Sequence, residues 1–229
     1  MNILICAGHT TKGDGTGAVG YLSESTENRV LSKLVVKYLK ELGANADYYE
    51  INESKNYLSL QVAAANKKNY DLVVQIHFNA YKKVTQSMGT ETLYRSSTGK
   101  KYAEQINKKL SALFKSRGVK HDINDVGKKL YWLSNTKSPA VLIETCFVDS
   151  KVDSDMYVMN KERVGQLIAE GIMNKDLNPP KPVDPIPTPK TDEYYRVVAG
   201  SFRNRDYAED TKNKLIKSGF DAFIEVYKK

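Results

Sequence analysis

The stretch "NILICAGHTTKGDG", residues 2–15, runs from six mostly apolar residues into a histidine and a polar, glycine-rich loop. Its first part, "NILICA", predicts a buried strand because it is almost continuously apolar. A loop that only connects two elements needs glycine and small polar residues, but it does not need an imidazole. His9 therefore directs attention to the other two histidines of the chain, His77 and His121.

The segments after this strand alternate between helical and strand patterns. Residues 24–43 place apolar side chains at helical spacing, and Gly43 is a suitable helix stop. Residues 71–80 are nearly all apolar up to Ile76, which predicts a strand buried on both faces. Further strands are predicted at 44–52, 89–95 (an edge strand), 130–134 and 140–148, and further helices at 58–68, 99–118 and 161–174. The alternation predicts an α/β fold with a mainly parallel central sheet flanked by helices.

Composition narrows the function classes. The 229 residues carry a net charge of +8, which suits a polyanionic surface, but no nucleic-acid-binding motif accompanies it. No apolar run is long enough for a membrane span, and the N-terminus lacks the pattern of a signal peptide, so we expect synthesis in the cytoplasm. Cys6 and Cys146 lie in apolar runs and predict buried free thiols rather than a disulfide. Without a CxxC pair, any metal site must use histidine and carboxylate ligands.

A proline-rich segment divides the chain. Six of the seven prolines lie between Pro179 and Pro189, and such a composition favours an extended spacer. We therefore predict a first domain at 1–177, a linker at 178–192 and a small second unit at 193–229. The second unit has a strand–helix–strand pattern, with a helix at 205–219 between strands at 194–202 and 220–227.

The predicted topology brings chemistry-bearing side chains to one edge of the sheet. In open α/β sheets, ligands bind outside the carboxyl ends of the strands. His9 and His77 end two predicted strands and Glu144 lies late in a third, although each histidine alone is also compatible with a hydrogen-bonded loop residue. Two imidazoles and a carboxylate form a common catalytic zinc set with a fourth position open to water. Glu24 and Glu27 both lie within reach as the carboxylate ligand, and their spacing does not choose between them.

Residues 2–175 resemble the zinc-dependent N-acetylmuramoyl-L-alanine amidases of the amidase-3 family, which occur in autolysins, sporulation amidases and phage endolysins. The matching stretches are "ILICAGHTTKGDGTGAVG", "ESTENRVLSKLV", "DLVVQIHFNA", "GTETLYR" and "AVLIETCFVDS", in the order of the family. The resemblance implies zinc ligands His9, Glu24 and His77, and it favours Glu24 over Glu27. It also implies that Glu144 is the general base, and that the bond cleaved joins N-acetylmuramic acid to L-alanine of peptidoglycan.

The remaining candidates carry weaker signals. Asn79 either orients substrate, supports His77 or simply ends its strand. His121 lies among polar residues, and we expect an exposed loop histidine without a role. Tyr131 and Trp132 are expected to pack in the core, with the alternative that one of them lines the cleft.

The C-terminal stretch "YYRVVAGSFRNRDYAEDTKNKL" and "GFDAFI" resemble half of a SPOR repeat, a module that binds peptidoglycan glycan strands. A unit of this size is hardly stable alone. We therefore expect either that two chains pair through residues 193–229 as a homodimer, or that the half packs on the first domain or stays partly disordered.

Three functions remain open at this point. The favoured one is a wall amidase that acts after release through a holin or cell lysis. The alternatives are a zinc peptidase that cuts within the stem peptide, and a wall-binding protein without activity.

Overall fold

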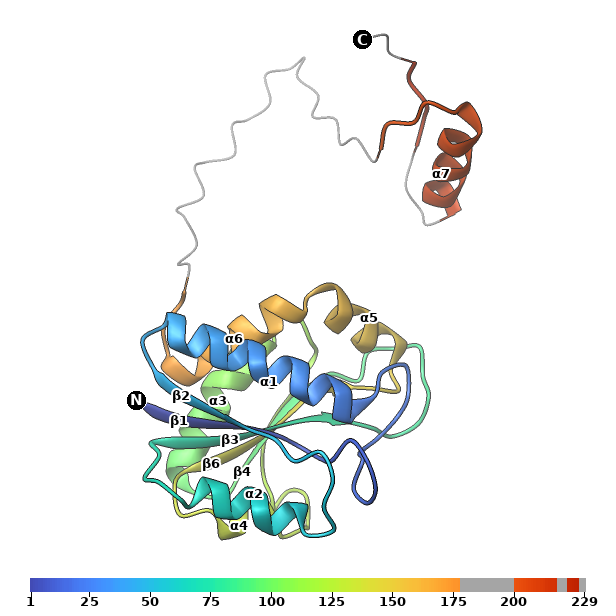
Figure 1. The fold of residues 1–229 in the computed structure, drawn as a ribbon. Helices are drawn as coiled ribbons and strands as arrows, with labels where there is room; N and C mark the ends of the chain where they lie inside the picture. Colours follow the sequence, from blue (N-terminus) through green and yellow to red (C-terminus); the bar gives the residue numbers. More distant parts are fainter. Residues whose placement is uncertain (178–199, 218–221, 227–229) are drawn as a thin grey trace. The chain divides into compact units, whose positions relative to one another are not determined.

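The structure is a computed structural model of the chain, and it describes residues 1–177, 200–217 and 222–226. The chain divides into two compact units, Met1–Pro179 and Pro180–Lys229 (Figure 1). The predicted linker at 178–192 lies outside the described residues.

A six-stranded sheet forms the centre of the first unit, in the order β2-β1-β3-β6-β4-β5. Neighbouring strands are parallel except β6 and β4, which are antiparallel. The strands are β1 (Asn2–Ala7), β2 (Asn45–Tyr49), β3 (Leu72–Asn79), β4 (Thr90–Tyr94), β5 (Ser116–His121) and β6 (Ala140–Phe147). The predicted α/β fold with a mainly parallel sheet is confirmed.

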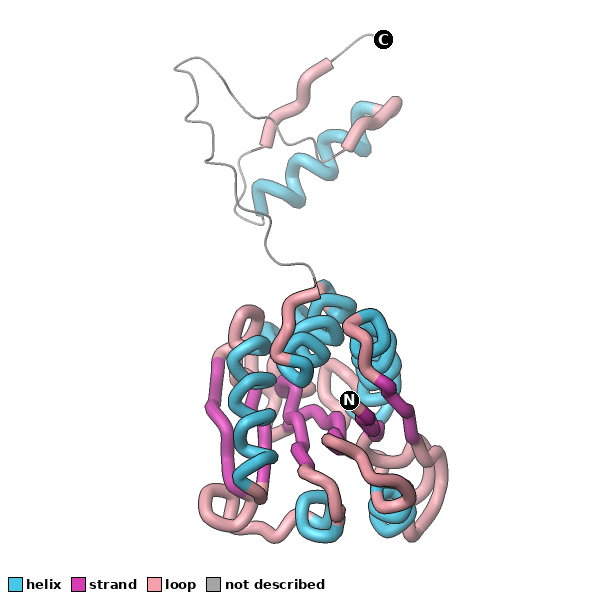
Figure 2. The backbone as a smooth tube through the Cα atoms, turned by 90° about the vertical axis from the view of Figure 1, so that its left-hand side faces the viewer, coloured by secondary structure: helices cyan, strands magenta, loops and turns pink. Residues whose placement is uncertain are grey.

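Helices cover both faces of this sheet (Figures 1 and 2). One face carries α1 (Glu24–Glu41), α3 (Ser97–Leu110) and α6 (Lys161–Met173), and the other carries α2 (Tyr57–Ala65) and α4 (Tyr131–Asn135). Helix α5 (Lys151–Met159) connects β6 to α6. The sheet is therefore the middle layer of three, as an apolar parallel sheet requires.

Strand β1 contributes alternate side chains to two hydrophobic cores, one on each face of the sheet. Ile3 and Ile5 pack into the larger core with α1, α3 and α6, whereas Leu4 and Cys6 face the smaller core beneath α2 and α4. Successive side chains of a strand point to opposite faces, so a strand between two helical layers must be apolar throughout. Cys6 and Cys146 are buried and free, which confirms that prediction.

The predicted strand at 130–134 is wrong, because Tyr131–Asn135 forms the short helix α4. Trp132 anchors this helix: it is 2% exposed, and its indole N–H donates to the Val141 carbonyl at 3.1 Å. Packing against the sheet thus overrides the strand propensity of the local residues. The core position predicted for Trp132 is confirmed, but Tyr131 is 43% exposed and does not share it.

Strand β5, like helix α5, is an element that the sequence analysis does not predict. Helix α3 ends at Leu110, Phe114 enters the core, and Ser116–His121 pairs with β4 at the edge of the sheet. Strand β4 is consequently not an edge strand, and His121 is the last residue of a strand rather than a loop residue. The sequence "SRGVKH" has a glycine and three basic side chains, so it offers no apolar run.

Of the second unit, the structure describes one helix, α7 (Arg205–Lys217), which confirms the helix predicted there. Residues 222–226 form no strand, in contrast to the prediction for 220–227. Most of the predicted strand at 194–202 lies outside the described residues, and 200–202 are not in a strand. None of the helices in the described parts of the chain is sufficiently long and apolar to pass through a membrane.

Candidate metal and catalytic site

His9 stands two residues after β1 with its backbone in the left-handed region, at φ 60°. Its ring Nδ1 lies 2.9 Å from the carbonyl oxygen of Gly15. Because a carbonyl only accepts hydrogen bonds, Nδ1 is the protonated nitrogen of the neutral ring, and Nε2 then has the lone pair. Arg29 of α1 holds the backbone beneath, since its guanidinium donates to the His9 carbonyl at 3.1 Å. The loop therefore presents Nε2 toward Glu24, and in the neutral ring this nitrogen has the lone pair that a metal ion binds.

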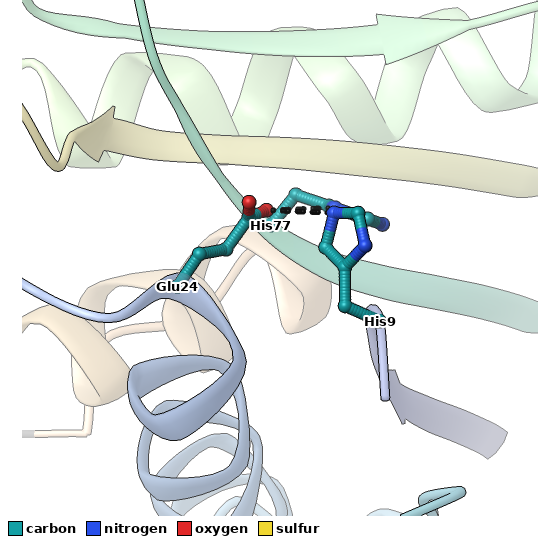
Figure 3. A group of neighbouring side chains, drawn as sticks. All are labelled: His9, Glu24 and His77. Carbon is teal, nitrogen blue, oxygen red and sulfur yellow. Dashed lines mark hydrogen bonds and ion pairs between the residues drawn. The ribbon is translucent and has the colours of Figure 1, made fainter. Parts of the chain in front are cut away.

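Glu24 is the first residue of α1, and its carboxylate points toward the two histidines (Figure 3). Its Oε1 is 3.0 Å from His77 Nδ1 and 3.2 Å from His9 Nε2. Backbone N–H groups of Phe78 and Ala18 donate to Oε1 and Oε2 at 3.1 and 2.9 Å. The carboxylate is thus fixed in position by two backbone donors in addition to the two imidazoles.

Together His9, Glu24 and His77 offer ligand atoms that all lie within 4.8 Å of one another. The two imidazole rings are 4.7 Å apart between centroids and nearly perpendicular. The structure thus brings together all three residues that the sequence analysis assigned as metal ligands, from three distant points of the chain (Figure 3).

Glycines make room for this cluster. A Cβ on Gly8 would lie 2.5 Å from two atoms of the His77 ring, and a Cβ on Gly17 would lie 2.8 Å from Glu24 Oε2. Gly17 also has φ +76°, a conformation that L side chains rarely adopt. The "GH" and "GTG" of the opening loop therefore serve the close approach of backbone to the clustered side chains.

Burial and the contacts within the cluster shift the pKa values of Glu24, His9 and His77. Burial opposes ionisation of Glu24, but the contacts with His77 and His9 outweigh it and hold its pKa far below the ordinary value. Burial also opposes protonation of His9, yet the contacts with Glu24 and Gly15 leave its pKa raised. At His77 burial dominates and lowers the pKa. An ionised carboxylate and a neutral imidazole are the forms that bind metal ions, so the shifts at Glu24 and His77 favour binding, whereas His9 must release its proton to bind.

Glu144 lies on β6 directly between His77 of β3 and Glu91 of β4 in the register of the sheet. Its Oε2 is buried, and no described residue forms a hydrogen bond with it. Burial, followed by the charges of Glu24 and Glu91, raises the pKa of Glu144 well above the ordinary value. A carboxyl group with a raised pKa beside a candidate metal site is suited to general acid–base catalysis.

The other carboxylate that the sequence left open, Glu27, has a different environment. It pairs with Lys161 at 2.8 Å and accepts a hydrogen bond from the Tyr157 hydroxyl at 3.1 Å. These partners come from α6 and α5, so Glu27 ties α1 to the C-terminal helices of the unit, one turn away from the histidines.

Two further candidates contact residues outside the cluster. Asn79 donates to Glu91 Oε1 at 3.0 Å, and no hydrogen bond between Asn79 and His77 is found in the described part of the chain. His121 lies on β5, packs edge-on against Tyr94 and accepts hydrogen bonds from the backbone of the following turn. His121 therefore takes no part in the cluster.

Sequence reasoning did not single out Arg29 or Glu91, although both adjoin the site. Arg29 follows directly on Asn28, which donates to the Gly8 carbonyl at 3.1 Å. Asn28 and Arg29 belong to the polar run "ENR", which is buried on the inner face of α1. Such a run in a buried helix face is the sequence signal for these two residues. Glu91 stands beside Glu144 in the strand "TETLY", but the sequence pattern predicts an edge strand there, where a charge is ordinary.

Fold and site together define a three-layer α/β protein with two histidines and a carboxylate at one sheet edge and a buried carboxyl beside them. Residues 3–174 match the N-acetylmuramoyl-L-alanine amidase family of the amidase-3 type, and the chain belongs to this family.

Individual proteins are similar to this chain in sequence or in structure. The solved catalytic domain of the CD27L endolysin, which targets Clostridia Difficile, is 34% identical with a TM-score of 0.70, covering 78% of this chain and 99% of that domain. The uncharacterised protein CPE1502 of Clostridium perfringens is 36% identical over 77% of this chain and 53% of its own length. The N-acetylmuramoyl-L-alanine amidase LytC of Bacillus subtilis is 29% identical over 75% of this chain and 35% of its own length. This chain thus spans about half the length of CPE1502 and about a third of LytC.

Proposed function

We propose that this chain is a zinc-dependent N-acetylmuramoyl-L-alanine amidase that hydrolyses peptidoglycan. The observation that carries the proposal is the convergence of His9, Glu24 and His77 within 4.8 Å beside the buried carboxyl of Glu144. Membership of the amidase family supports the reaction, and the geometry supports the residues that perform it.

The donor set fits zinc. Two imidazole nitrogens and one carboxylate oxygen are ligands that catalytic zinc sites use, with a further position left for water or substrate. The hydrogen bond from His9 Nδ1 to Gly15 fixes the tautomer that leaves Nε2 free, as outer partners of metal-binding histidines do. When bound, zinc supplies a Lewis acid for the amide carbonyl and a water of lowered pKa.

Glu144 acts first as general base and then as general acid in the proposed reaction. Its carboxylate takes a proton from the water as the water oxygen attacks the carbonyl carbon of the lactyl group. Glu144 then gives this proton to the nitrogen of L-alanine as the C–N bond breaks. The products are a muramic acid carboxylate and a peptide with a free L-alanine amine.

The test is digestion of purified peptidoglycan by the wild-type chain and by Glu144→Gln, with the new termini identified by mass spectrometry. New L-alanine amines from the wild type, lost in Glu144→Gln, support the proposal. New amines within the stem peptide identify a zinc peptidase instead, and no new termini identify a wall-binding protein without activity. Glu27→Gln is the matched control, because it removes a buried carboxylate that pairs with Lys161 and lies outside the cluster.

We also propose that residues 193–229 bind wall glycan as a half SPOR-like unit and pair between two chains as a homodimer. The resemblance of the sequence and the helix α7 support this. Co-sedimentation of the full chain with purified glycan strands, before and after removal of residues 193–229, tests the binding. Analytical ultracentrifugation of both forms tests the dimer, and a full chain that is monomeric excludes it.

The place of action follows from the substrate. We propose that the enzyme acts on the bacterial cell wall after it is released by a holin or by lysis of the cell. The likeness to the catalytic domain of an endolysin supports this. Turbidity of host cells exposed to the enzyme from outside, compared with cells that express it without a holin, tests the proposal.

A further inference from the structure

A row of ionisable side chains crosses four neighbouring strands beside the candidate site. His77, Glu144 and Glu91 are direct partners in the register of β3, β6 and β4. Paired residues project from the same face of a sheet. On β5, the next strand, Arg117 and Lys120 reach back to Glu91. The row therefore continues from the metal ligands to two cations.

The strand directions explain why Arg117 lies at the catalytic edge, whereas Lys120, near the end of β5, reaches toward this edge through its contact with Glu91. β4 runs antiparallel to β6, and β5 runs parallel to β4. The first residues of β4 and β5 consequently lie at the same edge as the last residues of β1 and β3. Glu91 and Arg117 are each the second residue of their strand, and Asn79, the last residue of β3, donates to Glu91 at 3.0 Å.

Glu91 holds both cations with a single oxygen atom. Its Oε2 accepts from Arg117 Nε at 2.7 Å and from Lys120 Nζ at 2.6 Å, while Oε1 accepts from Asn79. Two positive charges against one carboxylate leave a net charge of +1. Burial of Glu91 opposes ionisation, but the hydrogen bonds and charges of Lys120 and Arg117 outweigh it and lower its pKa, so the carboxylate stays ionised.

The two cations are held rather than free to move in solvent. The Arg117 guanidinium lies over the Phe147 ring at 5.0 Å, and the side chains of Arg117 and Lys120 are only 33% and 28% exposed. Arg117 uses Nε for Glu91, and no hydrogen bond from its terminal nitrogens is found among the described residues. These nitrogens form the planar fork that recognises a carboxylate.

We propose that Arg117 and Lys120, positioned by Glu91, form a subsite that binds a carboxylate on the peptide part of the substrate. The inference rests on the proposed amidase function. In an N-acetylmuramoyl-L-alanine linkage, the lactyl carboxyl is consumed in the scissile amide. Free carboxylates of the substrate therefore lie on the peptide side, and the subsite identifies the β5 side of the candidate site as the side that receives the leaving peptide.

The test compares a soluble N-acetylmuramoyl peptide that has free carboxylates with its fully amidated counterpart. For the wild type we expect KM to be at least about 10-fold lower for the free acid, as a charged hydrogen bond typically contributes. Lys120→Met removes the excess charge and leaves Arg117 paired with Glu91, so it should bring the two KM values close together with little change in kcat. Lys120→Arg should restore the preference.

Lys100→Met is the matched control, because Lys100 lies on α3 and pairs with Glu104 away from the site. It should keep the wild-type preference. Equal KM values of the wild type for both substrates overturn the subsite and leave the proposed function intact. Failure of the wild type to cleave either substrate contradicts the proposed function itself. The wild-type comparison decides between these outcomes even if a variant fails to fold.

Discussion

Gly8→Ala tests the close packing around His77. In the structure, a Cβ at this position would lie 2.5 Å from Cε1 and Nε2 of the ring and 2.7 Å from the Ile76 carbonyl oxygen. Ordinary contacts of a Cβ begin near 3.4 Å, so the ring must retreat by about 0.9 Å. A shift of this size moves Nδ1 away from its position 3.0 Å from Glu24 Oε1. We expect zinc affinity to fall by about 10- to 100-fold, the typical effect of disturbing the support of a ligand.

Overpacking also lowers stability by about 1–3 kcal/mol, so the assay must separate the two effects. Gly165→Ala is the matched control, because its Cβ would lie 2.7 Å from Leu34 Cβ, between α6 and α1. Zinc affinity is measured by competition with a chromophoric chelator, and stability by urea unfolding of the zinc-free chain. Gly8→Ala should lower both the zinc affinity and the stability to urea, whereas Gly165→Ala should lower only the stability. Wild-type zinc affinity in Gly8→Ala would refute the proposed packing of Gly8 against a metal ligand.

Three further substitutions test other parts of the site. Glu144→Gln should reduce turnover by about 100- to 10,000-fold while zinc binding stays at the wild-type level, and equal losses of both would contradict separate roles. Arg29→Met removes donors to the carbonyls of His9, Ser25 and Ile51, so urea unfolding should show a loss of about 2–4 kcal/mol together with weaker zinc binding. Glu91 has a lowered pKa, so it stabilises the fold above the ordinary glutamate pKa of about 4.3, and this contribution is lost as the pH falls through its lower folded-state pKa. Urea unfolding of Glu91→Gln should accordingly lack part of the acid dependence of the wild type, and identical pH profiles would exclude this contribution.

The strand ends were predictable because a buried parallel strand has a strong apolar pattern. "NILICA" and "DLVVQI" mark β1 and β3, and the histidine after each pattern must then lie at the carboxyl edge of the sheet. The resemblance to the amidase family supplied the choice of Glu24, because both Glu24 and Glu27 lie in the first turn of α1. In space they differ, since Glu24 points to the histidines and Glu27 to Lys161.

The β5 side of the site could not be predicted from local pattern. "SRGVKH" forms a strand only because β4 offers it a free edge, and Arg117 and Lys120 gain their place from pairing with Glu91. The antiparallel pairing of β4 with β6, which puts the start of β5 at the catalytic edge, likewise depends on the whole sheet. Short helix α4 depends in the same way on the contact of Trp132 with β6. Such elements follow from tertiary contacts between residues far apart in the sequence.

The most direct measurement is an anomalous diffraction map, recorded at the zinc absorption edge, from crystals of the zinc-loaded chain. The proposed site predicts one dominant peak about 2.0–2.2 Å from His9 Nε2, Glu24 Oε1 and His77 Nδ1, with Glu144 beside it and outside ligand distance. A peak bound by other residues, or no peak at these three side chains in crystals that contain zinc, would contradict it.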